Sequence, residues 1–394
     1  MRWASRRTFL AQAGAGLGLS GCLSAVARDH LAVFDAMWKT VDDRYFDPAM
    51  GGIDWKAVGR TWRPKAARAE TPAALYLDVL IPVLDQFQTS HVDLRPPGDA
   101  LTLTNGRTFP MPRQKRGTPI FMVSREDEAG MGASLTWTGS TYVVETVVAG
   151  GPAHVAGLRP GQSVQLAALS LPKNRREMRL VDRDGSSLTV IWRPRTAPPR
   201  REWRSPGHGV GQLRFDIFDQ PSVAWAIDTL GASASRSVVL DLRQNGGGLL
   251  AEMARLTSVL LPEGSSLGLF RSRQRDYRPA TGPVPTRFTG PLAVLVGPRT
   301  ASAAEITAAA LQHHGRARLF GTPSLGSVLA SRTYDLPDGG QLTLPFADYL
   351  TPSDSRLEEQ GVTPDILTPR TSDSVTNGSD PALDAALGWL RREQ

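Results

Sequence analysis

The chain contains a single cysteine, Cys22, among its 394 residues. An internal disulfide is therefore excluded, and Cys22 is either a structural thiol or a modified residue. No cluster of cysteine, histidine and carboxylate residues has the spacing of metal ligands, so we expect no metal ion and no other cofactor. Internal repeats and low-complexity tracts are also missing. What remains is a composition typical of a globular protein, 41% hydrophobic and 21% charged, long enough for two or three domains.

Charge of one sign is in only modest excess, since 45 basic residues face 38 acidic ones. Three of the arginines lie within the first seven residues, and the others are scattered along the chain rather than gathered with aromatic residues. Such a distribution predicts a solvated basic surface and excludes nucleic acid as the expected partner.

The first residues indicate export. Arg6 and Arg7 belong to a twin-arginine pattern, and the apolar run at residues 11–19 is too short to span a bilayer. The segment at residues 19–22 resembles a bacterial lipobox, whose cysteine becomes the lipidated first residue of the mature protein. Lipidation of Cys22 is therefore favoured over a structural thiol. We predict a twin-arginine lipoprotein signal peptide at residues 1–21 and a protein anchored by lipid at a membrane surface, on the periplasmic side of the bacterial cell envelope.

The rest of the chain divides by its hydrophobic pattern. Apolar residues recur at spacings of three and four across residues 22–95, which predicts a helical N-terminal domain. Residues 96–120 are rich in proline, arginine and threonine and are predicted to be a connector. Short β segments follow at 121–197, and strands alternate with helices at 201–372, which favours an α/β core with sites at the carboxyl ends of its strands. A C-terminal helix is predicted at 373–394.

The β-rich region contains a recognisable motif. Residues 151–161 resemble the signature of PDZ domains, although Gln162 stands where an aspartate is expected. The resemblance implies a PDZ-like domain that captures chain ends and extended peptides by adding a strand to a sheet edge. His154 is expected to face solvent and to have no catalytic role.

Ser302 occupies a junction that suits a nucleophile. A buried strand at residues 291–296 is broken by Gly297-Pro298-Arg299, and a helical segment rich in alanine and leucine follows. The free N–H groups and the dipole at the start of a helix favour negative charge nearby. An ordinary helix cap is the alternative role for this serine.

A glycine-rich turn, residues 241–248, follows another buried strand and precedes another helix. Consecutive glycines let the backbone bend and bring its N–H groups close to a ligand. Phosphate binding and an oxyanion hole are both possible uses, but the turn lacks the Lys-Ser/Thr ending of a Walker loop.

Taken together, these motifs resemble the C-terminal processing (tail-specific) serine peptidases, a family that includes the tricorn core peptidases. The matches follow the family's order along the chain: the PDZ-like segment and then residues 241–248, 300–305, 321–326 and 358–365. The resemblance implies a crotonase- or ClpP-like α/β core and serine endopeptidase activity on proteins with unstructured termini.

One position separates the branches of that family. The Ser-Lys members have a lysine where this chain has Ser327, and all five lysines here lie outside the predicted core, at positions 39, 56, 65, 115 and 173. Arginine cannot replace lysine as a base because its pKa is above ~12. The resemblance therefore points to the tricorn branch, which uses a histidine located before the PDZ domain and a glutamate near the C-terminus.

By that resemblance, Ser302 would attack the substrate and His91 would take its proton. Glu358 and Ser90 would orient the imidazole and stabilise its charged form. His91 as a simple polar boundary residue, and Glu359 in place of Glu358, are the alternatives.

The same resemblance implies that the backbone N–H groups of Gly247 and Ala303 would face the oxyanion. Glu305 and Asp241 also match family motifs and are expected to hold loops and helix ends. The alternative for the whole protein is a catalytically inactive, peptide-binding member of the same fold.

Overall fold

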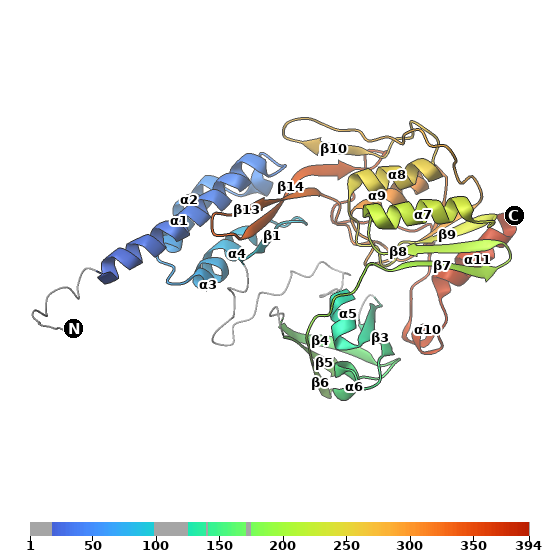
Figure 1. Ribbon diagram of the computed structural model, residues 1–394, viewed down its shortest axis with the longest axis horizontal. Coiled ribbons are helices and arrows are strands. Elements are labelled where there is room, and N and C mark those ends of the chain that lie inside the picture. The colour runs from blue at the N-terminus through green and yellow to red at the C-terminus, as the bar shows by residue number, and fades with distance from the viewer. Residues whose placement is uncertain (1–17, 98–124, 139–140, 171–174, 394) are drawn as a thin grey trace, which may run out of the picture.

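The computed structural model describes residues 18–97, 125–138, 141–170 and 175–393. Most of the predicted signal peptide and of the predicted connector lie outside these residues. Within them, helices at the N-terminus, a five-stranded sheet and a larger α/β unit follow one another along the chain (Figure 1).

The N-terminal region is helical. Its elements are α1 (Gly18–Arg44), the 3-10 helix η1 (Met50–Gly52), α2 (Trp55–Ala67), α3 (Pro72–Leu75), the π-helical segment η2 (Tyr76–Leu80) and α4 (Ile81–Leu84). Trp38 and Trp55 join α1 to α2: their rings stack 6.2 Å apart, and each indole N–H donates to the other residue's carbonyl. Cys22 lies in α1. Within the described residues, no helix combines the length and the apolar character needed to span a bilayer.

A four-stranded antiparallel sheet connects these helices to the rest of the molecule. Strand β14 (Gln341–Leu350) pairs with β1 (Asp93–Arg95), β10 (Leu269–Ser272) and β13 (Ala330–Asp335). Leu342 and Leu344 of β14 are fully buried among the N-terminal helices. The hydroxyl of Tyr76 donates to Asp338, in the turn between β13 and β14. Segments far apart in the sequence are thus packed into one apolar core.

The β2–β6 domain, residues 125–192, is an antiparallel sheet in sequential strand order. Its elements are α5 (Arg125–Met131), β2 (Ala133–Trp137), β3 (Tyr142–Val147), α6 (Pro152–Val155), β4 (Ser163–Ser170), β5 (Arg176–Asp182) and β6 (Ser187–Trp192). Gln162, at the position where an aspartate was expected, accepts a hydrogen bond from the Arg159 N–H at 3.1 Å. His154 is exposed.

The α/β core contains a six-stranded sheet in the order β15-β12-β11-β9-β8-β7, parallel except between β7 and β8. Its strands are β7 (Arg201–Gly207), β8 (Val210–Phe215), β9 (Ser237–Asp241), β11 (Leu292–Val296), β12 (Arg318–Gly321) and β15 (Ile366–Leu367). The prediction of a mixed α/β fold is confirmed.

Helices cover both faces of this sheet. One face packs on α7 (Gln220–Ala232), α8 (Leu250–Leu260) and α9 (Ala303–His313). The other face packs on α11 (Pro381–Glu393), which follows α10 (Ser372–Thr376). Residues alternate along β9 as the pleat requires: Val238 and Leu240 are buried on the first face and Val239 on the second. The parallel strands β9, β11 and β12 all end at one edge, and the loops that follow them carry the predicted motifs.

Candidate active site

Ser302 lies between β11 and α9, as the sequence predicts, and its backbone is in an unusual conformation. It caps α9 with φ 53° and ψ −122°, a positive φ that is rare outside glycine. Such a conformation costs roughly 1–3 kcal/mol and persists only where the surroundings hold it. Buried Thr300 contributes to that hold, because its hydroxyl donates to the Leu242 carbonyl at 2.9 Å and accepts from the Gly297 N–H at 3.0 Å.

The carboxylate of Glu305 joins the start of α9 to the loop after β12. Its Oε2 accepts from the N–H groups of Ser302 at 3.0 Å and Ser327 at 2.9 Å. Its Oε1 accepts from the Ser324 hydroxyl at 2.5 Å and the Gly326 N–H at 2.7 Å. Burial raises the pKa of this carboxyl, and the four hydrogen bonds act in the opposite direction. Glu305 therefore holds Ser302 and the 324–327 loop in one arrangement.

His91 lies just before β1 and, like Ser302, has a positive φ, 62°. The Ser90 hydroxyl is 2.7 Å from His91 Nδ1 and donates to Glu358 Oε2 at 3.0 Å. Glu358 also accepts from the N–H groups of Ser90 at 2.8 Å and Val328 at 3.0 Å, and it is 1% exposed. Because the Ser90 proton goes to Glu358, the network assigns the imidazole proton to Nδ1 and leaves Nε2 as an acceptor.

Ser327 connects this group to Ser302. Its hydroxyl is 3.5 Å from His91 Nδ1, and its carbonyl accepts from the Ser302 N–H at 2.9 Å. The structure thus brings Ser90, His91 and Glu358 together and links them to Ser302 through one intervening residue. Glu359, in contrast, is exposed, so the geometry favours Glu358 over its neighbour.

Gly247 packs directly against Ser302. A β-carbon on Gly247 would be 2.6 Å from Ser302 Cβ and 3.0 Å from the Ala303 nitrogen, and its φ of 94° also favours glycine. Its N–H donates to Asn245 Oδ1 at 2.9 Å, so this predicted oxyanion donor is engaged in the conformation described. Ala303 is the first residue of α9, where the helix leaves N–H groups without intrahelical partners.

Asn245 was missed by the sequence reasoning. It is fully buried, and its Nδ2 donates to the Phe215 carbonyl at 2.9 Å. The local signal was present: an asparagine two residues before a glycine commonly accepts from that residue's N–H. Ser327 was also missed as a neighbour of His91, because their contact spans 236 positions.

Asp241 and Arg243 hold the glycine-rich turn to the end of the chain. Arg243 donates to Asp241 Oδ2 at 2.6 Å and to Asp380 Oδ1 at 2.7 Å, which ties the turn to the start of α11. Burial pushes the pKa of Asp241 up, but the charge and hydrogen bonds of Arg243 outweigh it, and the pKa is lowered. These residues support the site from outside. In the described part of the chain, no group of three or more histidine, cysteine, aspartate or glutamate residues could hold a metal ion.

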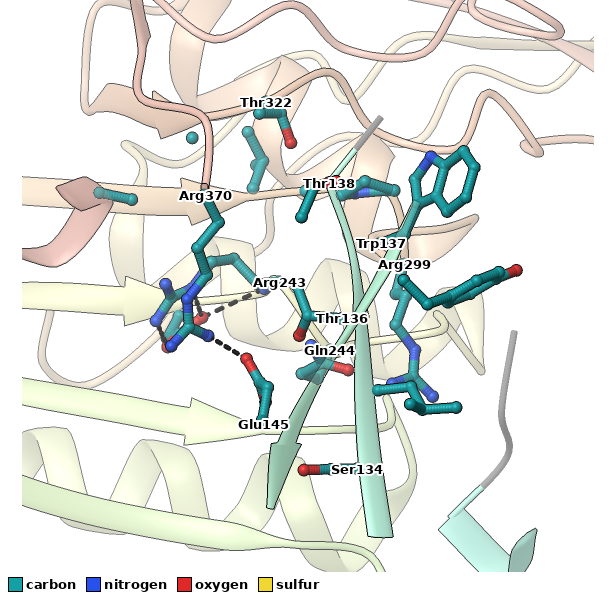
Figure 2. Close-up of a pocket in the computed structure, with 18 of the residues that line it drawn as sticks. Ser134, Thr136, Trp137, Thr138, Glu145, Arg243, Gln244, Arg299, Thr322 and Arg370 are labelled. Carbon is teal, nitrogen blue, oxygen red and sulfur yellow. Dashed lines mark hydrogen bonds and ion pairs between the residues drawn. The ribbon is translucent and has the colours of Figure 1, made fainter. Parts of the chain in front are cut away.

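A cavity of about 730 Å³ lies between the β2–β6 domain and the core. One wall is the stretch 132–138, which includes the edge strand β2, and the other includes Gln244, Arg299 and Leu325. Figure 2 shows Thr136 and Trp137 of β2 next to Gln244 and Arg299 of the core, which face them across the cavity. Two ion pairs cross the cavity: Arg299 with Glu128 at 3.1 Å, and Arg370 with Glu145.

Comparisons with known proteins point to a family of peptidases. The model of peptidase family S41 matches residues 209–368, and that of the tricorn protease C1 domain matches residues 27–80. The chain is 28% identical over 376 residues to carboxyl-terminal-processing peptidase 2, chloroplastic, of Arabidopsis thaliana, covering 86% of this chain and 69% of that protein. It is 27% identical over 385 residues to the carboxyl-terminal-processing protease of Synechocystis sp., covering 90% and 85%. The chain contains a peptidase family S41 domain at residues 209–368. It is therefore a serine-type peptidase, a hydrolase, and the predicted family is confirmed.

Solved structures of the S41 fold extend the likeness to most of the chain. The photosystem II D1 C-terminal processing protease superposes with a TM-score of 0.57 at 23% identity, covering 90% of this chain and 98% of that one. The tricorn protease superposes with a TM-score of 0.54 at 16% identity, covering 93% and 37%. At these identities the likeness concerns the fold. Assignment to the tricorn branch stays a prediction.

Proposed function

We propose that this S41 peptidase hydrolyses peptide bonds through an acyl-enzyme formed on Ser302. The Ser302 hydroxyl attacks the scissile carbonyl, and its proton passes to His91 Nε2. His91 returns that proton to the leaving amine as the C–N bond breaks. A water molecule then attacks the ester with His91 as base, the bond to Ser302 breaks, and the serine regains its proton. No lysine is required at any step.

The observation that carries this proposal is the Ser90–Glu358 arrangement behind His91. An imidazole that accepts a proton during the reaction needs its charge stabilised on the side away from the nucleophile. Ser90 contacts Nδ1 at 2.7 Å and passes its own proton toward Glu358, which three donors hold in place. A buried carboxylate is thereby coupled to the imidazole through one hydroxyl, in a chain whose sequence has no lysine after position 173.

The oxyanion is assigned to the start of α9. The Ala303 N–H and the helix dipole favour negative charge there, and each oxyanion donor contributes roughly 3 kcal/mol to the transition state. Gly247 supplies the second donor only after its N–H leaves Asn245 Oδ1, a local rotation that glycine permits.

Substrate capture is assigned to the β2–β6 domain acting as a PDZ-like module. Its edge strand β2 lines the cavity that also reaches Gln244 and Leu325, close to the catalytic loops. An extended peptide could add to that edge by main-chain hydrogen bonds, which suits protein substrates with unstructured termini. The twin-arginine and lipobox patterns support a location in the cell envelope, with Cys22 as the lipid-anchored residue.

A fluorophosphonate probe tests the nucleophile. The purified full chain should be labelled, and both Ser302→Ala and His91→Ala should abolish labelling while circular dichroism stays unchanged. Matched controls on the surface, Ser187→Ala and His154→Ala, should label like the wild type. Labelling that survives in Ser302→Ala would refute this mechanism. A folded wild type that binds peptides but takes no label would instead indicate a catalytically inactive, peptide-binding protein.

A further inference from the structure

Helix α2 presents an unusually basic surface. Between positions 55 and 68 the chain has five basic residues and no acidic one: Lys56, Arg60, Arg63, Lys65 and Arg68. All five are exposed, while Trp55, Val58 and Ala66 are buried toward the helical core. At 100° per residue Arg60 and Arg68 lie on the side opposite to the buried residues, Lys56 and Arg63 lie on the flank next to them, and Lys65 lies beside buried Val58. Four of the five bases, Lys56, Arg60, Arg63 and Arg68, therefore form one basic face. The helix therefore gathers charge that looks scattered in the sequence.

Neighbouring acids offset only part of this charge. Arg63 makes two hydrogen bonds of 2.8 Å to Asp35, and Arg60 is 3.9 Å from Asp54. Lys65 lies over the ring of half-buried Trp62, 3.7 Å from its centroid. Exposed pairs of this kind contribute little to folding. Stability of the helix thus gives no reason for four bases on one face.

The position of α2 relative to Cys22 indicates a membrane as the partner of the basic surface of α2. The two helices run antiparallel, since Trp38 contacts Trp55 and His30 Nδ1 is 3.0 Å from the Ala69 carbonyl. Cys22 lies eight residues before His30 in α1, about 12 Å along the helix axis. A membrane surface at Cys22 would be about 12 Å from the end of α2 along the helix axis, about one and a half times the Debye length of about 8 Å at physiological salt.

We propose that the basic face of α2 docks on anionic phospholipid headgroups beside Cys22, so that α1 and α2 lie along the bilayer. The site would then be held at a defined height and orientation rather than on a freely rotating tether. The orientation rests on the proposed lipid anchor, whereas the attraction to anionic lipid does not.

Vesicle binding tests the attraction without the lipid. The full chain carrying Cys22→Ser should bind vesicles that contain phosphatidylglycerol, should not bind pure phosphatidylcholine, and should dissociate at high salt. Each base near an anionic surface contributes about fivefold. Lys56→Gln, Arg60→Gln and Arg68→Gln together should therefore weaken binding at least tenfold. The matched control, Arg179→Gln, Arg193→Gln and Arg195→Gln, removes three exposed arginines from the β2–β6 domain or the segment after it and should bind like its parent.

The orientation has its own readout because the Cys22→Ser chain contains no other cysteine. A dye attached at Thr61→Cys, on the basic side of α2, should shift to the blue on anionic vesicles and be quenched by headgroup-labelled lipid. The same dye at Ser187→Cys, on β6, should report water.

Three outcomes would overturn the proposal: equal binding to neutral vesicles, equal losses in the two triple variants, or quenching at position 187 as strong as at position 61. An oligonucleotide bound more tightly than anionic vesicles, at equal phosphate concentration, would assign the surface to nucleic acid instead. The triple α2 variant and Thr61→Cys should both hydrolyse a soluble peptide at the rate of their parent. This test is therefore independent of the proposed catalytic residues.

Discussion

Replacing Glu305 by glutamine tests whether one buried carboxylate organises the active site. The two carboxylate oxygens accept four hydrogen bonds, from the N–H groups of Ser302, Gly326 and Ser327 and from the Ser324 hydroxyl. Glutamine has the same shape but only one acceptor oxygen. Whichever way the amide is oriented, its NH₂ group meets two of the four donors.

The magnitude follows from the donors that lose their partner. The Ser302 N–H keeps the Ser327 carbonyl and the Ser324 hydroxyl can rotate, so one N–H, of Ser327 or of Gly326, is left without an acceptor in either orientation. A buried donor that loses its partner costs about 1–3 kcal/mol, so Glu305→Gln should lower the free energy of unfolding by about 1–3 kcal/mol. Relief from burying a charge opposes this loss, because burial disfavours the ionised carboxylate. We expect a net loss in the lower half of that range, together with displacement of Ser302 from its positive-φ conformation.

Urea denaturation and fluorophosphonate labelling would measure the two effects. The matched control is Ser324→Ala, which removes one donor to Glu305 and leaves the carboxylate with its three N–H partners. The control should retain most of its labelling rate, whereas Glu305→Gln should lose at least tenfold more. Unfolding free energies within about 0.5 kcal/mol of wild type and normal labelling in Glu305→Gln would refute the idea that this carboxylate holds the nucleophile.

Two further substitutions probe the glycine-rich turn. Gly247→Ala should abolish labelling of Ser302, because the new methyl group would meet Ser302 Cβ at 2.6 Å; full activity by probe labelling would contradict that packing. Arg243→Met should cost about 3–5 kcal/mol by leaving Asp241 buried without its cation. In the wild type, folding lowers the pKa of Asp241. The ionised carboxylate therefore stabilises the folded protein above the pKa that Asp241 has in the unfolded chain, and this stabilisation is lost as the pH falls through its pKa in the folded protein. In Arg243→Met burial raises that pKa, so denaturant melts should show a larger deficit at neutral than at mildly acidic pH, and a pH-independent deficit would contradict the role of Arg243.

Local features of the site were predictable because their causes are local. Five apolar residues in β11, a break at Gly297 and an alanine-rich segment are sufficient to place Ser302 between a strand and a helix. The same applies to the turn after β9. Hydrophobic periodicity also located the N-terminal helices, since amphipathic helices bury a stripe with a period near 3.6 residues.

The local sequence alone does not decide the hydrogen bond between the Gly247 N–H and Asn245. A glycine-rich turn beside a nucleophile predicts N–H groups available to an oxyanion, but a side chain two residues earlier competes for one of them. Asparagine at that position satisfies its own amide against the Phe215 carbonyl and the Gly247 N–H together. Whether the Gly247 N–H donates to Asn245 or stays available to an oxyanion depends on the conformation of both residues, and residue types alone do not specify that conformation.

The position of His91 depends on contacts that no local pattern encodes. His91 is about 210 residues from Ser302 in the sequence, and spacing carries no information about that approach. The structure achieves it with β14, which leaves the core, pairs with β1 immediately after His91 and buries Leu342 and Leu344 among the N-terminal helices. Glu358 then binds Ser90 from the other side. Because His91, the proposed base, is carried by a region whose packing depends on that strand, it approaches Ser302 only when the N-terminal helices are docked. Folding of the helical region is therefore a condition for assembling the proposed site.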